Sequence, residues 1–153
     1  MTPSAPGITN SATEIAALLQ QTRVIAIVGL SPKPWRDSHE VAEYLQNHGY
    51  RIVPVNPHHT GQSIVGEACY ATLQDAASAL RAQGQVIDMV DCFRKSEDIP
   101  PIALDAIAIG AKCLWMQLGI SHIPAAEQAL AAGLAVVMNR CTKIDHRMLL
   151  TGS

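Results

Sequence analysis

The sequence predicts an α/β fold in which a parallel sheet of about five strands lies between two layers of helices. Short runs of mostly aliphatic residues recur along the chain, at 24–28, 51–55, 86–93, 112–116 and 134–138. Such runs are typical of parallel strands that are buried on both faces. Segments with apolar residues at helical spacing lie between most of them, which indicates right-handed β–α–β crossovers. We therefore expect an open, doubly wound, Rossmann-like sheet in three layers.

The predicted helices begin near residues that can accept hydrogen bonds from free backbone amides. These candidate N-caps precede amphipathic segments and are Thr13, Ser38, Thr72 and Ser96. A further helix is predicted at 123–132. Pro54 lies inside the second predicted strand and cannot donate to a hydrogen-bond ladder, which favours an edge strand or an irregular one.

Length and composition indicate one domain, which we place at 12–147, with a flexible tail at 1–11 and a C-terminal tail at 148–153. Of the 153 residues 48% are hydrophobic and the formal net charge is only -2. This balance gives no reason to expect binding to nucleic acid, and no apolar run is long enough for a membrane span. Widely spaced cysteines without a CxxC pair predict reduced thiols in the cytoplasm, at Cys69, Cys92, Cys113 and Cys141.

The most informative stretch is the loop that follows the first predicted strand. Gly29 ends the aliphatic run, and Ser38 precedes the next helix. A strand, a glycine loop and a helix start in this order direct backbone amides and the positive end of a helix at a common point. Lys33 and Arg36 add two cations to the same loop. The loop therefore predicts a site for a phosphorylated ligand.

Polar and basic residues also follow the other predicted strands. In an open parallel sheet, ligands bind outside the carboxyl ends of the strands, where these residues would meet. The basic residues after strands are Arg36, Arg94, Lys95, Arg140 and Lys143, and the neutral hydrogen-bonding ones are Ser31, Asn56, Gln117 and Asn139. Such a rim fits an anionic ligand with more than one phosphate. The alternative is that charged residues simply occupy exposed loops.

The usual nucleotide-binding signatures are absent from this loop. A dinucleotide site uses G-x-G-x-x-G after the first strand and an acidic residue after the second. Here the loop has one glycine, and Asn56 and Pro57 follow the second strand. The residues therefore disfavour NAD and predict a different grip on the phosphates.

Several motifs together resemble the family of small CoA-binding domains, which are similar to the N-terminal domain of the succinyl-CoA synthetase α subunit. The resemblance covers about 13–147 and is carried by V-G-L-S with P-x-R-x-S, H-G-Y-R-I-V-P-V-N-P, V-D-C-F-R, A-K-x-x-W-M-Q-L-G and N-R-C-x-K, in this order. It implies a Rossmann-like fold that binds coenzyme A at the carboxyl edge of the sheet. It also implies that Gly29, Ser31, Arg36 and Ser38 hold phosphates.

Other parts of the ligand are assigned by the same resemblance. Asn56 and Pro57 would border the adenosine, and Phe93 and Arg94 would form the opposite wall. His58 stands where family members often have lysine, so His59 or Lys33 would have to supply the cation for the ribose 3′-phosphate. The full set of predicted ligand-binding residues is Gly29, Leu30, Ser31, Lys33, Pro34, Arg36, Ser38, Asn56, Pro57, His58, Phe93, Arg94 and Gln117.

The function predicted from these residues is binding of coenzyme A or an acyl-CoA, without chemistry of its own. The alternatives are an enzyme that acts on a CoA thioester and an NAD-binding redox or regulatory domain. We find no catalytic constellation, phosphohistidine motif or metal site, and His122 is interpreted as a surface residue. Cys92 and Cys141 are interpreted as apolar filler, the alternative being thiols activated by nearby cations. Trp35 would cover the ligand or a partner, and a homodimer or another protein partner stays open.

Overall fold

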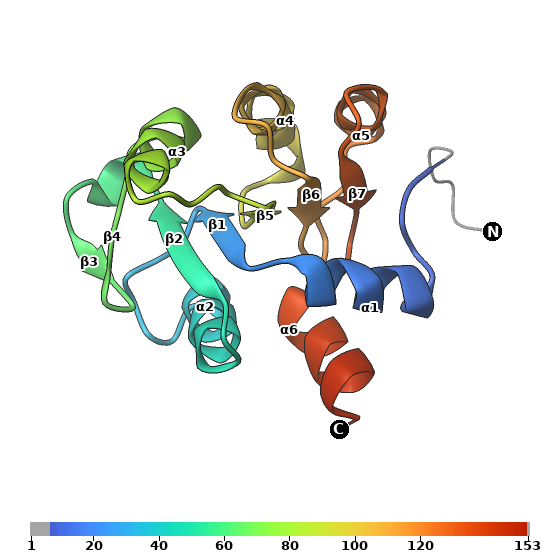
Figure 1. The fold of residues 1–153 in the computed structure, drawn as a ribbon, viewed down its shortest axis with the longest axis horizontal. Coiled ribbons are helices and arrows are strands. Elements are labelled where there is room, and N and C mark those ends of the chain that lie inside the picture. The colour runs from blue at the N-terminus through green and yellow to red at the C-terminus, as the bar shows by residue number, and fades with distance from the viewer. Residues whose placement is uncertain (1–6, 153) are drawn as a thin grey trace.

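A computed structural model describes residues 7–152 of the chain and confirms the predicted α/β architecture (Figure 1). The five-stranded sheet has the order β2-β1-β5-β6-β7, and every neighbouring pair is parallel. The strands are β1 (Val24–Val28), β2 (Arg51–Val55), β5 (Met89–Cys92), β6 (Cys113–Met116) and β7 (Ala135–Val137). The last three are shorter than the apolar runs that predicted them. A separate antiparallel hairpin joins β3 (Ser63–Ile64) and β4 (Glu67–Ala68).

Helices cover both faces of the sheet, which gives three layers (Figure 1). One face carries α3 (Leu73–Ala82), α4 (Ile99–Ala108) and α5 (Ile123–Ala131), and the other carries α1 (Ala12–Gln21), α2 (Asp37–Asn47) and α6 (Thr142–His146). No helix in the described part of the chain is long and apolar enough to cross a membrane.

Each layer of helices encloses its own hydrophobic core against the sheet. Alternate residues of β1 divide between the two, because Ala26 and Val28 pack toward α3 and α4 while Ile25 and Ile27 pack toward α1 and α2. Trp115 is fully buried and donates through Nε1 to the Arg140 carbonyl at 2.8 Å.

The two ends of the chain pack closer to the domain than the sequence indicated. Thr9 donates its amide to the Val136 carbonyl at 2.8 Å, so the segment 7–11 lies against β7. The rest of the predicted N-terminal tail lies outside the described residues. At the other end a π-helical turn, Arg147–Thr151, continues α6, and Leu149 and Leu150 pack against the core. Pro54 lies in the edge strand β2, as predicted.

The predicted helix starts are correct in one case and wrong in three. Thr72 caps α3 by accepting from the Asp75 amide. Ser11 rather than Thr13 caps α1, and α2 begins at Asp37, so that Ser38 lies inside its first turn. Ser96 opens a 3₁₀ turn, Ser96–Asp98, and its hydroxyl accepts from the Ser121 amide. Helix propensity does not contain the tertiary bond from the Ser121 amide, which occupies the Ser96 hydroxyl.

Candidate functional site

The carboxyl ends of β1, β2, β5 and β6 meet at one edge of the sheet, and the β1–α2 loop begins there with Gly29. The Gly29 backbone has a φ of 89°, and an added Cβ would lie 2.5 Å from the Phe93 carbonyl oxygen. The Gly29 amide donates to the Val55 carbonyl at 2.8 Å, and the Phe93 amide donates to the Val28 carbonyl at 2.9 Å. Only glycine fits this position, because the loops after β1 and β5 approach so closely.

Internal hydrogen bonds fix the shape of the loop from Gly29 to Ser38. The Ser38 hydroxyl accepts from the Ser31 amide at 3.0 Å, and the Ser31 hydroxyl accepts from the Lys33 amide at 3.1 Å. Asn56 holds the loop from the side, since its Nδ2 donates to the Leu30 carbonyl at 3.1 Å. Ser31, Ser38 and Asn56 therefore shape the loop for which the sequence predicts phosphate binding.

This loop borders a polar cavity of about 440 Å³, which we call the loop cavity. Lys33 and Arg36 bring two cations, and neither forms a salt bridge within residues 7–152. Asp37 brings one acid, in the first turn of α2. The residues that line the loop cavity are Gly29, Ser31, Lys33, Arg36, Asp37, Ser38, Asn56, His59 and Phe93. A net positive cavity at a helix start is suited to an anion.

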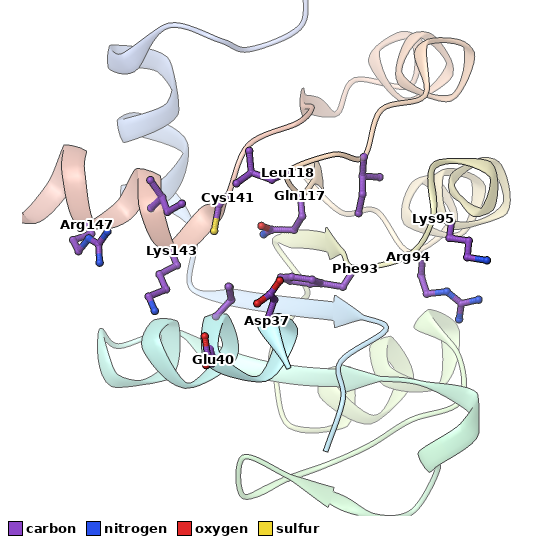
Figure 2. Close-up of a pocket in the computed structure, with 13 residues that line it drawn as sticks. Asp37, Glu40, Phe93, Arg94, Lys95, Gln117, Leu118, Cys141, Lys143 and Arg147 are labelled. Atoms are coloured by element: carbon purple, nitrogen blue, oxygen red, sulfur yellow. The ribbon is translucent and has the colours of Figure 1, made fainter. Parts of the chain in front are cut away.

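A second cavity, of about 640 Å³, opens beside the loop cavity, and we call it the larger cavity (Figure 2). Phe93 and Asp37 line both, so the two adjoin. The larger cavity lies between α2, the ends of β5 and β6, and α6, and its lining residues are Asp37, Glu40, Val41, Phe93, Arg94, Lys95, Gln117, Leu118, Ile120, Cys141, Lys143, Ile144 and Arg147. It mixes apolar side chains with charged ones at its rim.

A buried polar cluster stands beneath the larger cavity. The Asp91 side chain is fully buried, and its Oδ1 accepts from Gln117 Nε2 at 2.7 Å. Its Oδ2 accepts from the Thr142 hydroxyl at 3.1 Å, and Gln117 Nε2 also donates to Thr142 Oγ1 at 2.8 Å. Burial raises the pKa of Asp91 to about 7, against the hydrogen bonds from Gln117 and Thr142, which lower it. This cluster joins β5, the end of β6 and the start of α6.

Sequence reasoning identified Gln117 but missed Asp91 and Thr142. The available signal was an acidic residue in a strand that is otherwise apolar. Asp88 gives the same signal, and the structure places it in a structural role, because its Oδ2 accepts from the Arg23 and Val24 amides at 2.9 and 3.0 Å. Pattern alone does not separate the two aspartates.

Several predicted site residues lie away from the two cavities. The Leu30 side chain is fully buried in the core, and Pro34 and His58 line neither cavity. His59, the alternative cation, lines the loop cavity instead of His58. Pro57 lines a smaller cavity of about 250 Å³. Arg94 lines that cavity and the larger one, and its Nη2 lies 3.4 Å from Asp98 Oδ2.

The cysteines at the strand ends are not activated. Cys92 is fully buried, and burial raises the pKa of its thiol well above the ordinary value. Burial also raises the pKa of Cys141, against the backbone hydrogen bonds from Ile144 and Lys143, which lower it. The neighbouring Arg140 is engaged with Asp145, its Nε lying 2.7 Å from Oδ2. The raised pKa values agree with the interpretation of both residues as apolar filler and not with the alternative of thiols activated by nearby cations.

Two further residues that the sequence singled out, His122 and Trp35, line neither cavity. The His122 ring accepts from the Ala125 amide at 3.1 Å and so caps α5, which gives it a structural role. Trp35 is 70% exposed, with Lys33 Nζ 5.9 Å from its ring centroid.

Comparison with known proteins agrees with this arrangement. The chain is 36% identical over 136 residues to the uncharacterized protein YneT of Bacillus subtilis, which covers 89% of this chain and 94% of YneT. A hypothetical protein from Pyrococcus horikoshii has a solved structure with a TM-score of 0.83 and 35% identity, covering 98% of this chain and 99% of that one. The structure of the protein ID.343 from Thermus thermophilus also has a TM-score of 0.83, with 31% identity over 92% of this chain and 99% of that one. The model of the CoA binding domain matches residues 23–147. The chain therefore belongs to the CoA-binding domain family.

Proposed function

We propose that this protein binds coenzyme A or an acyl-CoA at the carboxyl edge of its sheet and performs no chemistry on it alone. The observation that carries this proposal is the contact between two unlike cavities at Phe93 and Asp37. Coenzyme A has a compact phosphorylated nucleotide at one end and a long, nearly neutral arm at the other. A smaller polar cavity joined to a larger cavity with a more apolar lining matches both parts of such a ligand.

The phosphates are assigned to the loop cavity. Arg36 and Lys33 supply charge, and within residues 7–152 the amides of Asp37 and Ser38, the first two of α2, donate to no carbonyl. His59 lines the same cavity from the turn after β2 and is suited to the ribose phosphate. The pantetheine arm and any acyl group then extend past Phe93 into the larger cavity.

Binding without catalysis is favoured by the chemistry of the lining residues. Within the described chain, Cys141 is the only thiol that lines either cavity, and burial raises its pKa. His59 Nδ1 faces Gln62 Oε1 at 3.2 Å, which pairs it with an amide and not with a nucleophile. These residues do not form the base and nucleophile pair that acyl transfer requires.

Native mass spectrometry of the full chain, followed by calorimetric titration, tests the proposal. Retained coenzyme A, or micromolar binding of coenzyme A or acetyl-CoA without binding of NAD, is the expected result. Binding of NAD alone would favour the redox alternative, and hydrolysis of acetyl-CoA by the purified chain would favour the enzyme. Binding of none of the three would overturn the proposed function.

A further inference from the structure

The Asp91–Gln117–Thr142 cluster bears on how the larger cavity selects its ligand. All three side chains are at least nine-tenths buried, and only Gln117 lines the cavity. Figure 2 shows the Gln117 side chain between Phe93 and Cys141, directed toward the space that these residues enclose. What Gln117 presents there depends on which end of its amide faces inward.

The hydrogen bonds of the cluster determine that orientation. Above its folded pKa of about 7 the Asp91 carboxyl is ionised and only accepts, so both of its oxygens need donors. The Thr142 hydroxyl gives its single proton to Asp91 Oδ2 at 3.1 Å and is left as an acceptor. Both remaining acceptors, Asp91 Oδ1 and Thr142 Oγ1, receive protons from Gln117 Nε2, at 2.7 and 2.8 Å. The amide nitrogen is thereby saturated.

The oxygen of the same amide is left for a ligand. Within residues 7–152, no group donates a hydrogen bond to Gln117 Oε1. A reversed amide would place Oε1 against the acceptor oxygens of Asp91 and Thr142, which costs two hydrogen bonds in a buried site. The cluster therefore fixes an acceptor at the wall of a partly apolar cavity.

We propose that Asp91 and Thr142 are positioning residues that hold the Gln117 carbonyl oxygen toward the larger cavity, where it accepts a hydrogen bond from a secondary amide of the pantetheine arm. This inference rests on the proposed function and adds to it the chemical group of the ligand that the larger cavity recognises. The cavity selects an arm that carries an N–H donor at this depth, and an ester or hydrocarbon arm leaves Oε1 unpaired.

The location of the cluster supports a role beyond stability. Asp91 lies in the central strand β5 with a fully buried carboxylate, and no cation within the described residues forms a salt bridge with it. A well-packed apolar side chain at such a position is often as stable as a buried charge or more so. A buried acid that orients a cavity-lining amide has a use that an apolar residue does not provide.

Paired variants of Thr142 test the proposal by calorimetry. Thr142→Val keeps the shape of the side chain but removes the acceptor for Gln117, whereas Thr142→Ser keeps the hydroxyl. The ligands are coenzyme A and adenosine 3′-phosphate 5′-diphosphate, which lacks the arm. We expect Thr142→Val to bind coenzyme A roughly fivefold more weakly with unchanged affinity for the truncated nucleotide, and Thr142→Ser to restore it.

Two results would overturn the inference while leaving the proposed function intact. One is equal coenzyme A affinity in wild type and a folded Thr142→Val. The other is an equal loss for both ligands, which indicates a general structural effect. If wild type binds neither ligand, the proposed function fails as well.

A measurement without any variant keeps the orientation testable. In ¹⁵N side-chain amide spectra of the free wild-type protein, both Gln117 protons should exchange slowly with solvent, since they face Asp91 and Thr142. Fast exchange of these protons, or a nuclear Overhauser contact between them and bound coenzyme A, would show the reverse orientation and contradict the proposal.

Discussion

Replacement of Asp91 by asparagine tests whether the central strand carries a buried charge that costs stability. The Asp91 carboxyl is fully buried, and burial raises its pKa from 3.8 to about 7. An asparagine side chain at this position has nearly the same shape and carries no charge at any pH. The pH dependence of the difference between the two proteins therefore isolates the free energy of ionising this carboxyl inside the fold.

The direction in which the free energy of unfolding changes with pH follows from proton linkage. Between the unfolded and folded pKa values the native state holds the proton and the unfolded state does not, so rising pH lowers the free energy of unfolding of the wild type. The loss is complete above the folded pKa. A shift from 3.8 to about 7 corresponds to about 4 kcal/mol, of which about 3 kcal/mol falls between roughly pH 4.5 and 8. Asp91→Asn lacks this loss and gains stability relative to wild type over that interval.

Urea unfolding of both proteins at several pH values between about 4.5 and 8 measures the difference. The stability of Asp91→Asn minus that of wild type should rise with pH and level off above the folded pKa. Glu127→Gln, on the exposed side of α5, is the control and should show little change. A flat difference, or one that falls with pH, would refute the interpretation of Asp91 as an uncompensated buried acid.

Three other variants test the loop cavity. Arg36→Ala should weaken coenzyme A binding at least about tenfold in calorimetry and leave the melting temperature unchanged. Arg81→Ala on α3 is the control and should change neither quantity. A lower melting temperature with unchanged affinity would make Arg36 a structural residue. Asp37→Asn should strengthen binding about threefold at low salt, because it removes the acid from the cavity, and a weaker complex would contradict the placement of phosphates there. Gly29→Ala should lower the free energy of unfolding in urea by about 3 kcal/mol. Gly84→Ala is the control and should lower it by about 1 kcal/mol, because Gly84 has a similar φ but open space around it. Equal losses would mean that the contact with Phe93 relaxes freely.

The fold was predictable because five aliphatic runs and the helices between them leave few alternatives to a parallel sheet. The helix starts were less predictable. Ser38 and Ser96 have the right chemistry for N-caps, but their hydroxyls accept from the distant amides of Ser31 and Ser121. Such bonds depend on which loops meet, and propensity does not contain that information.

The loop cavity was predictable, and so were Phe93, Arg94, Lys95, Gln117 and Lys143 of the larger cavity, but the polar cluster beneath that cavity was not. Gly29, Arg36 and Asn56 follow strand ends, and the rule for parallel sheets brings strand ends together. Asp91 lies inside a strand, and Thr142 starts a helix that the sequence analysis did not predict. Their hydrogen bonds with Gln117 form only where β5, the end of β6 and the start of α6 meet. No single pattern in the sequence predicts that these three elements meet.

The proposed binding mode places coenzyme A in both cavities at the carboxyl edge of the sheet. The most direct test is a titration of ¹⁵N-labelled protein with coenzyme A, followed by backbone amide chemical shifts. We expect saturable shifts in the β1–α2 loop around Arg36 and around Phe93, Gln117 and Lys143, with α3 and α5 unaffected. Shifts confined to another surface, or no shifts at millimolar coenzyme A, would contradict it.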